Sequence, residues 1–105
     1  MEITKEIKEI LNDIISLVSP KKVYVYGAKY TVNNSRVKSV DFCVIINDDK
    51  IDTGEVEKKL YLGIDSDLLF NVLVFKESDF NELLSDSFTF ASRIMAKGYL
   101  AYEQK

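Results

Sequence analysis

The feature that most constrains the fold is the alternation of strand-like and helix-like segments along the chain. Three short runs rich in β-branched and aromatic residues are typical of strands, and they cover residues 23–26, 40–46 and 68–75. The first run stops at Gly27, and the polar segment 29–38 separates it from the second. The third run is the most apolar, so we expect it to lie at the centre of a sheet.

Helix-like segments flank these runs. Apolar residues recur at spacings of three and four over residues 3–18, which predicts an amphipathic helix that ends at Ser19-Pro20. A second helix is expected to begin at a cap formed by Asp52 or Thr53. Its apolar side consists of Val56, Leu60 and Leu62.

Two further helices follow the third strand-like run. Ser78 or Asp79 can cap a short helix that continues through Leu84. The last helix is expected to end at Lys97-Gly98, because a basic residue followed by glycine is typical of a helix C-terminus. The apolar residues of this last helix are Phe88, Ala91, Ile94 and Met95.

The order of these segments predicts one α/β (α+β) domain over residues 1–105. We expect a small mixed β-sheet of about three strands, covered on one side by helices. A length of 105 residues and a hydrophobic content of 47% suit a single globular domain. Many functions use such a scaffold, so the fold alone does not identify the function.

Composition excludes several kinds of function. A net charge of −3 argues against general nucleic-acid binding, which needs a basic surface to neutralise phosphates. The chain has no histidine, which removes catalytic triads, His-ligated zinc and imidazole acid/base chemistry. Its single cysteine, Cys43, is expected to be a small buried hydrophobic residue, and a reducing compartment fits.

The location of the protein is predicted from two further features. The first residues alternate charged with apolar side chains and lack the apolar core of a signal peptide. No segment approaches the roughly 20 continuous apolar residues that span a bilayer. We therefore expect a cytoplasmic protein that is not inserted in a membrane.

The most informative motif joins the first two strand-like runs. Val25-Tyr26-Gly27-Ala28-Lys29-Tyr30 is followed by a polar loop and then by Lys38-Ser39-Val40-Asp41-Phe42-Cys43-Val44. A related polar position is Asn71, in the third strand-like run Asn71-Val72-Leu73-Val74-Phe75. The chain closes with Gly98-Tyr99-Leu100-Ala101-Tyr102-Glu103.

In order and spacing, these segments resemble the minimal nucleotidyltransferases of the DNA polymerase beta superfamily, over nearly the whole chain. In that family a strand ends in Gly-Ser and opens a short helix, and a second strand carries Asp-x-Asp. The resemblance places Gly27, Ala28 and Lys29 at the phosphate-binding positions. It places Ser39 and Asp41 at the Asp-x-Asp positions and Asn71 at the third carboxylate position.

The chemistry of the family's site explains these residue types. Backbone N–H groups at a helix start, helped by a serine hydroxyl, hold a triphosphate. Residues two apart on a strand face the same side, so Asp-x-Asp aims two carboxylates at one point. A third carboxylate completes a cage for two Mg²⁺ ions, which activate the attacking hydroxyl and stabilise the leaving pyrophosphate.

By the resemblance, this cage is degenerate. Ser39 and Asn71 replace two carboxylates, Ala28 replaces the serine, and Asp41 alone retains its charge. Neutral ligands bind hard cations far more weakly than carboxylates do. The expected function is a binding module for a protein partner, either a small helical toxin-like protein or a second copy.

An alternative function is an active Mg²⁺-dependent enzyme that moves a nucleoside monophosphate from NTP to a hydroxyl, with Asp41 as its catalytic carboxylate. Another alternative is an unrelated α/β domain in which the spacing is coincidental. Acids elsewhere could rescue the cage, namely Asp48, Asp49, Asp65 and Asp67, but their distance along the chain argues against them.

The individual residues also have ordinary structural interpretations. Gly27 can simply make a turn after a strand. Asp41 faces either solvent or the former site, whereas Ser39 and Asn71 can be solvated or cap a helix. The basic residues Lys29, Arg36 and Lys38 form a solvated loop or attract a phosphate without metal. Exposed tyrosines would suit an interface, and the candidates are Tyr24, Tyr26, Tyr30, Tyr99 and Tyr102.

Overall fold

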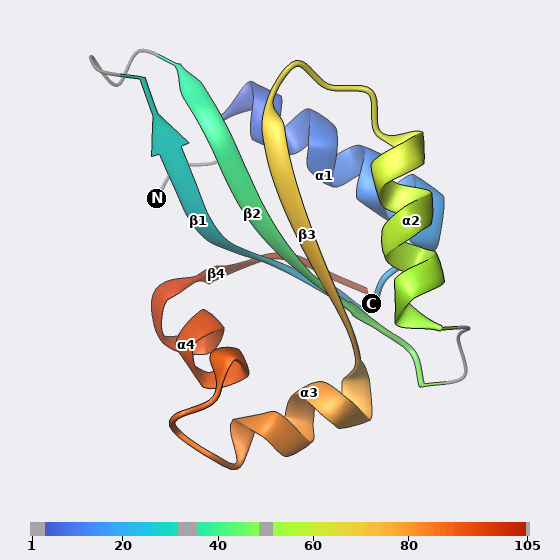
Figure 1. Cartoon of the computed structure of the whole chain (residues 1–105), viewed down its shortest axis with the longest axis vertical. Helices are drawn as coiled ribbons and strands as arrows, with labels where there is room; N and C mark the ends of the chain where they lie inside the picture. The colour runs from blue at the N-terminus through green and yellow to red at the C-terminus, as the bar shows by residue number, and fades with distance from the viewer. Residues whose placement is uncertain (1–3, 32–35, 49–51, 105) are drawn as a thin grey trace.

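The fold is built on a mixed β-sheet, seen in a computed structural model that describes residues 4–31, 36–48 and 52–104 (Figure 1). These described residues form four helices and four strands. In chain order they are α1 (Lys5–Val18), β1 (Lys22–Tyr30), β2 (Val37–Ile46), α2 (Thr53–Gly63), β3 (Leu69–Lys76), α3 (Glu77–Leu84), α4 (Phe90–Lys97) and β4 (Tyr99–Glu103).

The strands lie in the order β3-β2-β1-β4. β1 is antiparallel to both β2 and β4, whereas β2 and β3 are parallel, so the predicted mixed sheet is confirmed. The prediction of about three strands omitted β4, which is short and pairs with β1 from the far end of the chain. The expectation of a central third strand is wrong, because β3 lies at one edge and β2 is internal.

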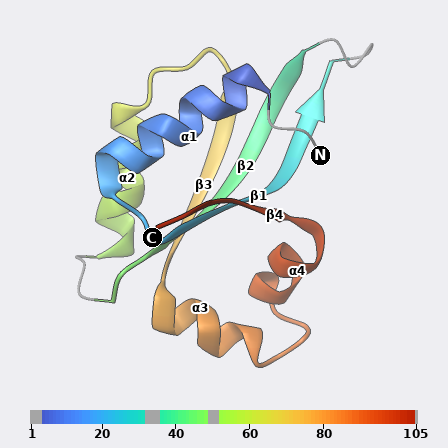
Figure 2. The same cartoon turned by 180° about the vertical axis from the view of Figure 1, so that it is seen from behind.

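Helices cover both faces of the sheet, so the prediction of helices on one side only is wrong. Figure 2 shows α1 lying across β3 and β2 on one face, and α3 and α4 lie on the other. The reason lies in β2, where Phe42 and Val44 belong to one core cluster and Cys43 and Ile45 to the other. A strand that is apolar on both faces must be covered on both.

The first core lies between the sheet and α1. Thr4 caps this helix by accepting a hydrogen bond at Oγ1 from the Ile7 amide, 3.2 Å away, and the helix ends before Ser19, as expected. Its apolar stripe is buried, which confirms the predicted amphipathic helix from Lys5 onward, while Ile3 lies outside the described residues. The buried stripe consists of Ile7, Ile10, Leu11 and Ile14.

Helix α2 packs beside α1 and lies along the outer edge of β3. Asp52 caps it by accepting from the Gly54 amide at 2.6 Å, as predicted, whereas Leu62 is 79% exposed and lies outside the apolar side to which it was assigned. The Tyr61 hydroxyl accepts a 2.8 Å hydrogen bond from the Val72 amide, and its ring stacks on Phe70. These contacts occupy part of the unpaired edge of β3.

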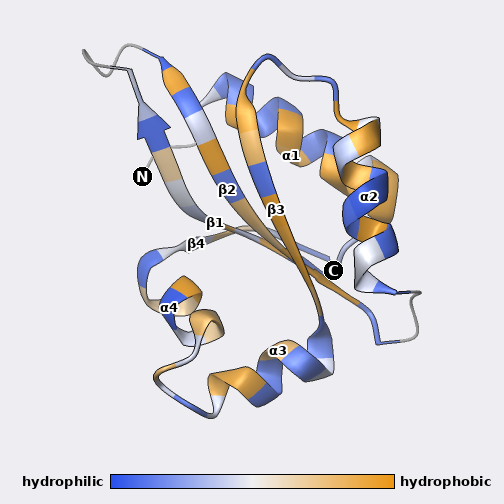
Figure 3. Cartoon of the chain, in the orientation of Figure 1, coloured by the Kyte–Doolittle hydropathy of each residue, from blue (hydrophilic) through white to orange (hydrophobic). Residues whose placement is uncertain are grey.

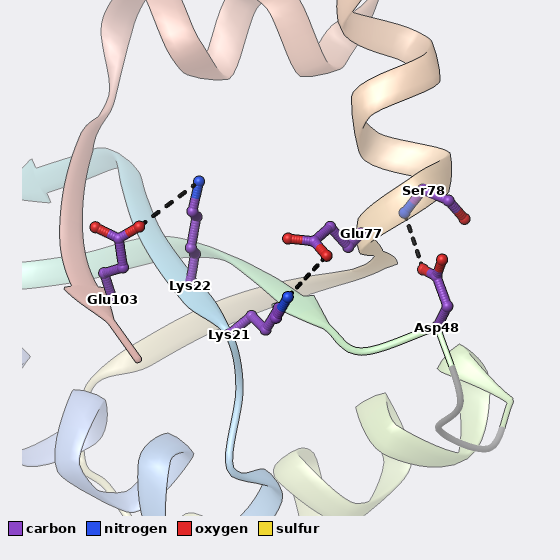
Figure 4. Close-up of polar contacts among 6 residues, drawn as sticks. All are labelled: Lys21, Lys22, Asp48, Glu77, Ser78 and Glu103. Carbon is purple, nitrogen blue, oxygen red and sulfur yellow. Dashed lines mark hydrogen bonds and ion pairs between the residues drawn. The ribbon is translucent and has the colours of Figure 1, made fainter. Parts of the chain in front are cut away.

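The second core lies between the sheet and the pair α3 and α4. Helix α3 begins at Glu77 without a side-chain cap of its own, so the predicted Ser78 or Asp79 cap is wrong. Asp48, from the end of β2, instead accepts a 2.9 Å hydrogen bond from the Ser78 amide (Figure 4). Lys21 pairs with Glu77 at 2.9 Å in the same region. The buried members of this core are Tyr24, Cys43, Ile45, Phe80, Ala91 and Ile94.

Helix α4 ends at Gly98 as predicted, although Phe88 and Met95 are exposed rather than buried. An added Cβ on Gly98 would lie 2.8 Å from the Ile94 carbonyl oxygen and 2.9 Å from the Val25 carbonyl oxygen. Only glycine therefore lets the chain pass this close to β1 before it enters β4. None of the helices within the described ranges is long and apolar enough to cross a membrane.

The buried cysteine generates a test of the second core. Burial raises the pKa of the Cys43 thiol from 9.0 to about 12. The thiol is neutral in both states below pH 9, and only the unfolded chain ionises as the pH rises above that value, so stability falls between pH 9 and 12. In urea unfolding, we expect the free energy of unfolding to fall by up to about 1.4 kcal/mol per pH unit over this range.

The control is Cys43→Ala, which lacks the thiol and should lose less stability over the same pH range. A thiol reagent should leave the native protein unmodified at about pH 8 and label it only after unfolding. Rapid labelling of the native protein at that pH would contradict the buried position of Cys43.

Candidate functional site

Helices α3 and α4 leave one half of their face of the sheet uncovered. Their cover extends to Tyr26, whose ring meets Phe90 edge to face at a centroid distance of 5.6 Å. Beyond it, β1, β2 and β3 continue away from both helices (Figure 1), and hydrophilic bands interrupt β2 and β3 there (Figure 3). We call this surface the open half-sheet, and it consists of Gly27, Lys29, Ser39, Asp41, Leu69 and Asn71.

Strand register aligns these six residues in two rows. Gly27 is paired with Asp41, and Asp41 with Asn71, so the first row crosses three strands. The second row is formed in the same way by Lys29, Ser39 and Leu69. Ser39 and Asp41 are two residues apart on β2, so the two rows lie on the same face.

The first row is held together by the Asp41 side chain. Its Oδ1 accepts a 2.9 Å hydrogen bond from the Asn71 amide nitrogen, and this pair is exposed. Its Oδ2 would lie 2.6 Å from a Cβ added to Gly27, which is closer than two such atoms can approach. Gly27 is therefore needed because the carboxylate lies against the β1 backbone. Its φ angle is not in the left-handed region, so a tight turn is not the reason.

Five of the six residues assigned by the resemblance thus come together, and Ala28 does not. Ala28 pairs with Val40, which is fully buried in the first core, so it faces the opposite side of the sheet. β1 also continues to Tyr30, so the interpretation of Gly27 as the end of a strand is wrong. The resemblance implies that a helix starts at Gly27, but this segment belongs to β1. The backbone N–H groups of a helix start, which would bind a phosphate, are therefore not present at Gly27.

The donor set does not fit a two-metal cage. The row contains a single carboxylate, Asp41, and one of its oxygens already accepts from Asn71. Ser39 adds only a neutral hydroxyl. Within the described ranges, no group of three or more His, Cys, Asp or Glu side chains could hold a metal ion. Two Mg²⁺ ions require several hard anionic ligands, so no metal-dependent step follows from these residues.

The acids that could have rescued the cage lie elsewhere. Asp48 accepts a hydrogen bond from Ser78 at the start of α3. Asp65 and Asp67 line a groove against α1, together with Glu9 of that helix. Asp49 lies outside the described residues. Within the described ranges, none of them joins Asp41 in a group of three or more residues that could hold a metal ion.

The predicted basic loop is also divided. Lys29 lies in the open half-sheet, whereas Arg36 lines the acidic groove against α1. Lys38 is exposed where the register between β1 and β2 shifts. Lys29 and Arg36 therefore do not converge on one phosphate.

Tyr26 forms the boundary between the covered and open parts of the face, a role that sequence patterns did not indicate. Burial, with a smaller effect from the negative charge of Asp41, raises the pKa of its hydroxyl to about 12. Its partner Phe90 comes from α4, so only the tertiary structure brings the two rings together. Among the tyrosines proposed for an interface, Tyr24 is buried and Tyr30 is 37% exposed, whereas Tyr99 and Tyr102 pack on the first core.

The contact between Gly27 and Asp41 can be tested with a double-mutant cycle. We expect Gly27→Ala to destabilise the protein by about 1–2 kcal/mol, because the new methyl group displaces the carboxylate. In an Asp41→Ala background the same change should be neutral or stabilising, because alanine is favoured over glycine in a strand. Urea unfolding of the four proteins measures the coupling energy.

An Asp48→Ala background provides the control, since it removes a different carboxylate. In this background, Gly27→Ala should destabilise the protein as much as it does in the native protein. An equal cost of Gly27→Ala in all three backgrounds would contradict the predicted contact.

No protein-family model, curated protein or solved structure matches this chain. The resemblance to nucleotidyltransferases rests on residue order and spacing and stays a prediction. Any functional proposal therefore depends on that resemblance and on the geometry of the open half-sheet.

Proposed function

We propose that this chain is a catalytically silent domain of nucleotidyltransferase-like organisation that works by binding a protein partner. One observation carries the proposal: Asp41, the sole carboxylate of the open half-sheet, is hydrogen-bonded by the neutral Asn71 and lies against Gly27. Five of the six residues assigned by the resemblance share one face of the sheet, and there Asp41 and Asn71 form a hydrogen-bonded pair rather than a set of metal ligands.

Charge explains why binding is favoured over transfer of a nucleotide. The reaction needs two dications held beside a triphosphate, and three carboxylates normally balance that charge. Here a single carboxylate and the nearby Lys29 leave the open half-sheet with no net charge. Such a surface neither concentrates Mg²⁺ nor neutralises a triphosphate.

The composition of the open half-sheet suits a protein interface. Leu69 is 68% exposed beside Ser39, within a surface that is otherwise polar. Tyr26 and Phe90 form an aromatic border at one end. Aromatic residues are enriched at protein interfaces, and the buried centre of an interface is apolar. The resemblance implies a small helical partner.

The first test restores the missing carboxylates. Ser39→Asp with Asn71→Asp would place three carboxylates on one face, so we expect Mn²⁺ affinity to rise at least about tenfold over the native protein. Isothermal titration calorimetry with Mn²⁺ alone measures this. The matched control is Asn12→Asp with Gln104→Glu, which adds the same charge at two separate exposed positions and should not bind.

The native protein itself decides between the two functions. We expect no release of pyrophosphate from any of the four NTPs with Mg²⁺ or Mn²⁺. If the native protein transfers a nucleotide and Asp41→Ala does not, the chain is an enzyme and the proposal is wrong.

The second test concerns the binding surface. Leu69→Asp should abolish the complex with a partner that co-purifies stoichiometrically with the native chain, because it places a charge in the contact. Leu62→Asp is the matched control, since Leu62 is 79% exposed on α2, away from the open half-sheet. Equal loss of the complex in both variants would exclude the open half-sheet as the specific surface.

A further inference from the structure

The hairpin formed by α3, α4 and the turn between them separates charge by sign. Residues 77–86 contain four acidic side chains and no basic one, whereas α4 contains Arg93 and Lys97 and no acidic one. Figures 1 and 2 both show the two helices next to each other at one end of the molecule. This end therefore has an acidic half and a basic half.

Among the described residues, most of these charges form no ion pair. Glu77 is paired with Lys21. Among the ion pairs between described residues, none includes the other acidic side chains of the hairpin or the two basic ones. The charges without such an ion pair are Asp79, Glu82, Asp86, Arg93 and Lys97, although the Asp86 carboxylate accepts a 2.9 Å hydrogen bond from the Phe88 amide.

The acidic half contains a hollow that is lined by both apolar and acidic side chains. It has a volume of about 600 Å³, and Phe75 and Leu83 line it. The acidic residues Asp79, Glu82 and Asp86 also line it. A complementary surface would therefore combine basic side chains with apolar ones.

The basic half has that composition. Phe90, Arg93 and Lys97 follow one another at spacings of three and four, so they form one stripe along α4. The buried residues of α4, Ala91 and Ile94, pack into the second core. Phe90 is 44% exposed, and Phe88, in the turn between the helices, is 88% exposed. Phe88 thus places exposed apolar surface between the acidic and basic halves.

We propose that this surface, the α3–α4 face, binds a second copy of the chain across a two-fold axis that passes near Phe88. A two-fold axis brings the same surface of both copies together, so the basic stripe of each copy meets the acidic hollow of the other. Both halves of the complementary pair are present on one chain, which favours a second copy over an unrelated basic helix. Phe88 of each copy is covered at the centre.

The size of this face predicts the strength of the dimer. A stable interface covers roughly 800 Å² of each partner, about an eighth of this protein's 6734 Å². Two short helices and one turn supply that area only if most of their outer surface is used. We therefore expect a dissociation constant in the micromolar range. It should increase with salt, because salt screens the attraction between exposed charges.

A charge-swap experiment tests the proposal. One variant carries Asp79→Lys with Glu82→Lys, and the other carries Arg93→Glu with Lys97→Glu. In either variant alone, like charges face each other across the axis, so we expect both to be monomers while the native protein is a dimer. An equimolar mixture restores opposite charges at both contacts, and sedimentation equilibrium should show a 1:1 heterodimer.

The matched control is Lys58→Glu with Lys59→Glu, which makes the same charge change on exposed positions of α2 and should leave the dimer intact. Circular dichroism establishes that each variant is folded. Formation of the heterodimer in the mixture is a second control, because unfolded chains could not form it. A native protein that stays monomeric at about 500 μM, well above a micromolar dissociation constant, overturns the proposal, even if it binds a basic peptide. Failure of the mixture to associate overturns it too.

Discussion

Burial of β2 on both faces is the constraint on which the rest of the structure depends. Its residues from Phe42 to Ile46 are all buried, and they alternate between two separate cores. One core needs α1 and α2, and the other needs α3 and α4. Because α3 and α4 are short, they cover only the part of the sheet nearest to them, and the open half-sheet is what they leave uncovered.

Local patterns predicted the parts of the fold that depend on local physics. The apolar spacing of α1 and the Asp52 cap are set by residues within a few positions of each other. Features that depend on distant pairing were not predicted. β4 forms a strand because it pairs with β1. The start of α3 is capped by Asp48, which lies 30 residues from Ser78 in the chain.

The candidate site shows the same division. The alternation of β2 was enough to place Ser39 and Asp41 on one face, and the strand register adds Gly27 and Asn71 to the row of Asp41. Ala28 was misplaced because the family turns into a helix at this point, whereas β1 continues as a strand. In a strand, the residue after Gly27 must face the other side, so a motif matched in sequence is not matched in space.

The two outer edges of the sheet bear on how this domain can assemble. At one edge, Tyr61 occupies the Val72 amide that an incoming strand would need. At the other, the register of β4 shifts between Leu100 and Tyr102, which leaves Ala101 out of step with β1. Interrupted edges resist the strand-by-strand growth that leads to amyloid-like aggregates. A chain with so much β-structure can then present helices and a bare sheet face to other molecules without polymerising through its own backbone.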